Sequence, residues 1–105
     1  MTHGATNALL FDFKLEYTFE DDKLAELDRQ LALLLSTPEG AMPLNREFGI
    51  KMDFVDKPLE VVKSLYTAEV ARKIPQFIPW VRVYEVTFEY GEQGHIKPKV
   101  VITRV

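Results

Sequence analysis

The sixteen Asp and Glu side chains are the most numerous groups in this chain that could act as acids or bases. Glu85 and Glu89 fall on one face of a predicted strand, but four residues at about 3.3 Å each separate their attachment points by roughly 13 Å. Glycosidase pairs need carboxyl groups about 5–5.5 Å or 6.5–9.5 Å apart. Asp21 and Asp22 are neighbours on a predicted helix and do not face one another. These carboxylates therefore predict a solvated polar face.

Other reactive side chains are few. The chain contains no cysteine, which excludes disulfides, thiolate zinc sites and cysteine nucleophiles. Its two histidines, His3 and His95, have no partner at metal-ligand spacing, and neither Ser36 nor Ser64 lies in a nucleophile elbow. The glycine-flanked segment 91–94 joins two predicted strands and opens no helix, so it is no phosphate cradle. We expect no enzymatic activity, catalytic residue, metal, cofactor or small-molecule substrate.

Composition and charge indicate one globular domain over residues 1–105, with residues 1–7 frayed. The 105 residues are 47% hydrophobic and 28% charged, which suffices for a single core. A net charge of −3 provides no field that would attract nucleic acid or an anionic membrane. Residues 1–7 have no basic region, and charges interrupt the apolar stretch that follows. We therefore expect no signal peptide, no membrane span and a cytoplasmic site of synthesis.

The first half of the chain predicts a strand and a helix. Apolar residues occupy the odd positions from Leu9 to Phe19, and from Asp12 onward polar residues occupy the even ones, which is typical of a half-buried strand. A helix is predicted over 22–35, behind an acidic start that suits its dipole. Its apolar stripe is made of leucines: Leu24, Leu27, Leu31, Leu34 and Leu35.

Residues 36–57 form a connection of about twenty residues, which is long for a compact domain. Apolar positions from Phe48 to Phe54 alternate with others, as in a short strand or extended arm. A disordered linker would not carry this much apolar surface. We predict that the connection is ordered.

A second helix is predicted from Pro58 to Ile74, with Pro75 ending it and with Lys73 off its apolar stripe. In the strand predicted over 80–90, the apolar phase changes between Val83 and Tyr84. This change indicates a bulge, or a strand covered on both faces.

The turn residues 91–94 predict a hairpin into a last strand over 95–105. Together, these elements predict an α+β fold in which a small three- to four-stranded, mainly antiparallel sheet packs against two helices, in the order β-α-loop-α-β-β.

The last strand is predicted at the edge of the sheet, because Pro98 cannot donate to a ladder. Pro98 and Lys99 guard only its first half. The second half invites another chain to add a strand, unless a helix or loop of the same molecule covers it. The residues concerned are Val100, Val101, Ile102 and Val105.

Residues 37–49 read TPEGAMPLNREFG. This segment resembles the T-P-x-G-x-x-P-x-x-R-x-F-G segment of the baseplate wedge proteins of contractile phage tails. These sheath initiators are often labelled lysozyme-like and have relatives in type VI secretion and other contractile injection systems. The resemblance covers roughly residues 24–105. It implies a protein at the top of a baseplate wedge, whose partners are the tail sheath protein and other wedge proteins.

The resemblance also implies site residues. Arg46, Phe48 and Gly49 would belong to a wedge-binding loop. Alternatively, Phe48 plugs the core, Gly49 supplies a special backbone angle and Arg46 caps a helix C-terminus.

The family commonly has Glu-Pro-Arg before the penultimate strand. Here the triplet is Ile78, Pro79 and Trp80, with Arg82 two residues further on. An apolar contact through Ile78 and Trp80 is the expected substitute for the charged one, since tryptophan is a frequent interface anchor.

These observations predict a structural component of a contractile phage-tail, prophage or tail-like baseplate. It would link the wedge to the sheath and nucleate sheath assembly by strand addition. It would be found in the bacterial host cytoplasm during assembly and then in the baseplate of the virion or particle. Despite the lysozyme-like label, no muramidase activity is expected. The alternative is a stand-alone, self-associating protein-interaction module.

Overall fold

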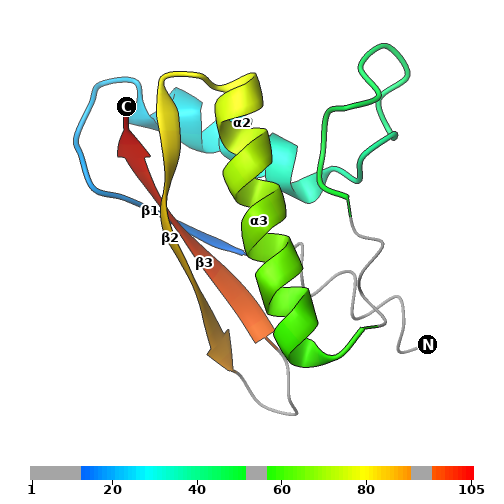
Figure 1. Cartoon of the computed structure of the whole chain (residues 1–105). Coiled ribbons are helices and arrows are strands. Elements are labelled where there is room, and N and C mark those ends of the chain that lie inside the picture. The colour runs from blue at the N-terminus through cyan, green and yellow to red at the C-terminus, as the bar shows by residue number, and fades with distance from the viewer. Residues whose placement is uncertain (1–12, 52–56, 91–95) are drawn as a thin grey trace.

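A computed structural model describes residues 13–51, 57–90 and 96–105 (Figure 1). Its elements are β1 (Lys14–Tyr17), α2 (Leu24–Ser36), α3 (Leu59–Phe77), β2 (Val81–Tyr90) and β3 (Ile96–Arg104). Helix α3 lies along the sheet and α2 crosses α3 (Figure 1). The fold is α+β, with two helices and a three-stranded mixed sheet, as the sequence predicts.

The strand order is β1-β3-β2, so the last strand is the centre of the sheet. It pairs with β1 in parallel, from Lys14 opposite Lys99, and with β2 in antiparallel fashion. The prediction that this strand lies at an edge is therefore wrong. Pro98 is tolerated because it lies opposite Phe88 of β2 and precedes the first residue that pairs with β1.

The bulge predicted in β2 is confirmed, because the pairing register shifts between Val83 and Glu85. Val83 packs toward the core before the bulge, and Val86 and Phe88 pack toward it afterwards. The antiparallel pairing of β2 with β3 confirms the predicted hairpin. Its turn residues lie outside the described part of the chain, as do residues 1–12 and 52–56.

The two helices match the predictions made from the sequence except at two residues of α3, Pro75 and Lys73. All five leucines of the predicted α2 stripe are buried or pack against the core. Helix α3 continues past Pro75 to Phe77, because a proline in the last turn removes only its own N–H bond. The N–H of Ile78 still donates to Ile74 O at 2.8 Å. Lys73, expected off the stripe, is completely buried.

One face of the sheet packs on the helices and the other is polar. The fully buried core of the domain joins α2, α3, β2 and β3 through Leu31, Tyr66, Val81, Val100 and Ile102. Tyr17 ties β1 to α2, since its hydroxyl donates to Asp28 Oδ1 at 2.6 Å.

Side chains on the polar face pair with one another across the strands. The Thr18 hydroxyl of the segment after β1 donates to Thr103 Oγ1 at 2.8 Å, and Lys99 Nζ lies 3.7 Å from Glu16 Oε2. Lys14, Glu16 and Glu85 of this face are exposed to solvent. In the described ranges, no helix has the length and apolar character needed to cross a bilayer.

Candidate functional site

The segment that carries the family resemblance is folded tightly onto α3. Lys73 Nζ donates to Glu39 Oε2 at 2.6 Å and to the carbonyl oxygen of Glu47. The N–H of Lys51 donates to Glu69 Oε2 at 2.8 Å. The Lys73 ammonium lowers the pKa of the Glu39 carboxyl through this hydrogen bond. Lys73 thus holds the segment near its beginning and near its end, and Glu69 holds the chain just after it.

The two ends of the same segment meet. The N–H of Ile50 donates to Thr37 O at 2.8 Å, and the N–H of Glu39 donates to Ile50 O at 3.0 Å. Gly49 lies between them with φ of 110°, and a Cβ there would be 2.5 Å from Thr37 O. Only glycine fits this position, which confirms the backbone alternative for Gly49.

Phe48 is half-buried and packs edge-on against Phe77, with 5.2 Å between ring centroids. This contact confirms its packing role in the core. Arg46 is exposed and forms no hydrogen bond or ion pair with the part of the chain that the structure describes, so the expected helix cap is absent. Wedge binding by this loop stays a prediction.

An apolar groove runs beside the loop, between it and the end of α2. It is lined by Leu33, Met42, Pro43, Leu44, Asn45 and Phe48. A neighbouring hollow continues it to Phe77 and Ile78. Leu44 is 100% exposed and Leu33 is also exposed. This groove was not predicted from the sequence, although Leu33, an apolar residue of α2 outside the predicted stripe, indicated a second apolar surface on this helix.

The Ile78-Pro79-Trp80 segment is divided between core and surface. Ile78 is buried and Pro79 is exposed. Trp80 is 38% exposed and packs edge-on against Phe19, at 6.2 Å between centroids. Arg82 is exposed and belongs to the polar face of the sheet. The open side of Trp80 is available as an anchor.

The last strand cannot accept another strand. β3 pairs with β1 on one side and β2 on the other, and its Val100 and Ile102 are fully buried. Val101 is half-buried on the polar face. Val105 is 81% exposed, with its N–H donating to Trp80 O at 3.2 Å. The proposed mechanism, in which this strand is completed by another chain, is overturned because its own fold already completes it.

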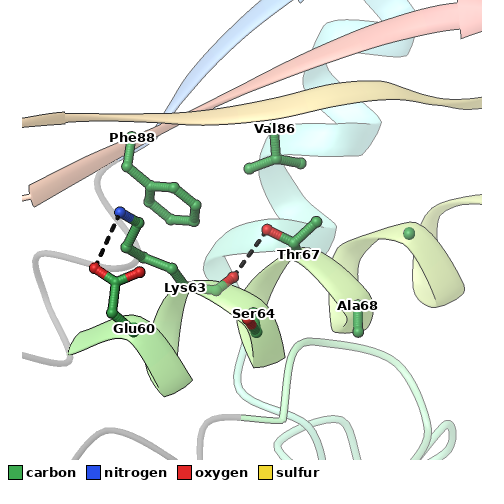
Figure 2. A pocket seen from close by; sticks show the side chains of 8 residues that line it. Glu60, Lys63, Ser64, Thr67, Ala68, Val86 and Phe88 are labelled. Atoms are coloured by element: carbon green, nitrogen blue, oxygen red, sulfur yellow. Dashed lines mark hydrogen bonds and ion pairs between the residues drawn. The ribbon is translucent and has the colours of Figure 1, made fainter. Parts of the chain in front are cut away.

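The sheet has two edge strands in the part of the chain that the structure describes, and the longer open edge belongs to β2, with ten residues against four in β1. Among the described residues β2 pairs with β3 alone, which leaves its other edge unpaired along ten residues. A groove lies between β2 and α3, and Figure 2 shows Val86 and Phe88 projecting from the strand toward the helix. The helix side of the groove carries small residues: Ser64, Thr67, Ala68 and Ala71.

One end of this groove is charged. Lys63 Nζ lies 3.6 Å from Glu60 Oε2 and 5.8 Å from the centre of the Phe88 ring (Figure 2). The Thr67 hydroxyl donates to Lys63 O at 2.8 Å and is thus satisfied by its own helix. An unpaired strand edge beside a groove of small and apolar side chains suits an added strand, whose main chain would pair with β2.

The sequence analysis missed this edge because it assigned the free edge to the wrong strand. Ser64, Ala68 and Ala71 are small residues spaced four and three apart on one helix, and this spacing was the available signal.

Among the residues that the structure describes, no group of three or more His, Asp or Glu side chains is placed to hold a metal ion. His3 and His95 lie outside them. The Tyr66 hydroxyl is buried without a hydrogen-bond partner among them, and burial raises its pKa. It belongs to the closed core and is inaccessible to a ligand.

No family model, curated protein or solved structure matches this chain.

Proposed function

We propose that this chain is a structural component of a contractile phage-tail, prophage or tail-like baseplate, where it links the wedge to the tail sheath and nucleates sheath assembly by strand addition. The observation that carries the proposal is the unpaired ten-residue edge of β2 beside the groove of α3. The accepted strand would come from a sheath subunit and lie against this edge. Main-chain hydrogen bonds would supply affinity and the groove would supply selectivity.

A surface other than the β2 edge would attach to the wedge. The 37–50 loop presents an apolar groove with the fully exposed Leu44, and Trp80, the residue before β2, offers a partly open ring. The loop is held by Lys73, so its shape is set before binding and little ordering entropy is lost. The protein would reach the baseplate from the host cytoplasm, where it is assembled.

The test uses sheath protein from the same genome, with sheath polymerisation followed by sedimentation and electron microscopy. The wild-type chain should shorten the lag of polymerisation and be found at one end of each tube. Val86→Lys places a charge at the groove and should abolish this nucleation. Val101→Lys, a matched change of a half-buried valine on the polar face, should leave nucleation intact.

Nucleation by the Val86→Lys protein would rule out the β2 edge, and the absence of nucleation by the wild-type chain would contradict the tail function. Sheath, tube and spike genes beside the gene for this chain would support the assignment.

A further inference from the structure

We infer that the open edge of β2 pairs with the same edge of a second copy of this chain, which joins two sheets into one of six strands. The inference concerns the edge that the proposed function assigns to a sheath strand, but its test uses the isolated chain and does not depend on that function. It follows from the order of side chains along β2, which is complementary to itself in one register.

The two faces of β2 differ on either side of its bulge. Val83, Val86 and Phe88 pack on the helix side, whereas the exposed Arg82 and Glu89 lie on the polar side. Arg82 and Glu89 are seven positions apart, and in a regular strand an odd separation would put them on opposite faces. The extra residue at Tyr84 brings them to the same face.

Antiparallel pairing about a two-fold axis at Val86 places this residue opposite Val86 of the second copy. Glu85 then lies opposite Thr87, and Tyr84 is left as the extra residue, as it is against β3. Beyond the bulge, Val83 lies opposite Phe88 of the second copy. Every pair in this register joins two side chains on the same face of the sheet.

The same register places Arg82 opposite Glu89 of the second copy, and the two-fold axis repeats this ion pair. Opposite charges across strands are stabilising and like charges are not. Moving the axis by one residue, to Thr87, would place Glu85 opposite Glu89 twice. Charge therefore favours the register centred on Val86 over the register centred on Thr87.

The groove of α3 leaves room for this pairing. Its Ser64, Ala68 and Ala71 are small, so no large side chain of the helix overhangs the β2 edge at these positions. The half-buried rings and methyl groups of Val83, Val86 and Phe88 would lose their remaining solvent contact across the axis. An unprotected edge of ten residues is an aggregation hazard, and a closed two-fold pair removes it.

The experiment is sedimentation equilibrium of the full chain over a concentration series at low and high salt. The wild-type chain should form a dimer of twice 12.1 kDa that weakens at high salt. Arg82→Glu or Glu89→Arg alone turns both ion pairs into repulsions and should raise the dimer dissociation constant at least about tenfold. The double variant restores opposite charges and should return to within about threefold of wild type.

Lys14→Glu is the matched control, because it reverses a charge on the exposed side of β1 and should leave dimerisation unchanged. Glu89→Arg places a second positive charge opposite Lys97 of its own chain, so its unfolding is measured alongside. The double variant keeps the repulsion from Lys97, so a recovered dimer affinity must come from the restored ion pairs between the two copies.

Hydrogen exchange supplies a second readout, since amides of residues 83–88 should gain protection as protein concentration rises. A wild-type chain that stays monomeric overturns the inference. So do a dimer insensitive to both single variants, a double variant that does not recover, and concentration-dependent protection confined to β1.

Discussion

Lys73 Nζ lies 2.6 Å from Glu39 Oε2, a carboxylate 34 residues earlier in the chain. The lysine is fully buried, and the Glu47 carbonyl is its second acceptor. A buried ammonium is costly unless it is paired and hydrogen-bonded. This pair therefore makes the conformation of the 37–50 loop depend on one residue of α3.

Lys73→Met should release the loop while keeping an apolar side chain of similar length. Hydrogen bonds to charged groups contribute about 1.5–3 kcal/mol each, so the free energy of unfolding should fall by at least that range. Urea denaturation measures the change. Arg29→Met is the control, because its ion pair with Glu26 is exposed to solvent on both sides and should contribute little to stability. Equal losses in the two variants would contradict the role of Lys73.

Acid should weaken the same contact. The folded-state pKa of Glu39 is lowered by Lys73 from its ordinary value of 4.5. A lowered pKa means that the carboxylate stabilises the fold above pH 4.5 and that this contribution is lost as the pH falls through the folded value. Glu39→Gln should therefore be less stable than wild type at pH 7, and the difference should shrink below pH 4.5. A difference that is constant with pH would exclude this ion pair as its cause.

Two glycine substitutions should differ in cost. Gly40 and Gly49 both have positive φ, of 91° and 110°, so alanine at either costs about 1–2 kcal/mol in backbone conformation. A Cβ at Gly40 meets no atom within 4 Å, whereas one at Gly49 lies 2.5 Å from Thr37 O. Thermal unfolding should show a clearly larger loss for Gly49→Ala. Similar melting temperatures for the two variants would refute the close approach of Thr37.

Removal of residues 100–105 should unfold the domain, because it deletes the middle of the sheet and the buried side chains of Val100 and Ile102. Removal of the exposed Val105 alone should leave the fold intact. Circular dichroism and the dispersion of NMR amide signals distinguish the outcomes. A folded protein without residues 100–105 would contradict the central position of β3.

The sequence was sufficient for features that depend on local pattern. Leucines at helical spacing predicted α2, and the change of apolar phase near Tyr84 predicted the bulge in β2. Both signals are periodic, and burial of one face reinforces them. The glycine role at position 49 was also predicted, because few residues other than glycine adopt such backbone angles.

Features that depend on distant partners were not predictable. The order of strands in a sheet is a tertiary property. Pro98 was taken as the sign of an edge strand, because the sequence does not show that the pairing with β1 begins only at Lys99, after this proline. Lys73 was placed off the apolar stripe of its helix, and its burial was not predictable because its acceptors are 26 and 34 residues away. An open edge was assigned to β3, which is the central strand, for the same reason.

The parallel pairing of β1 with β3 brings together residues 85 positions apart, as in the bond between Thr18 and Thr103. Closing so large a loop costs entropy before any contact compensates for it. Such a high contact order should make the domain fold more slowly than a helical bundle of equal size. Until β1 joins it, the β2–β3 hairpin is a two-stranded ribbon, which is only marginally stable in water.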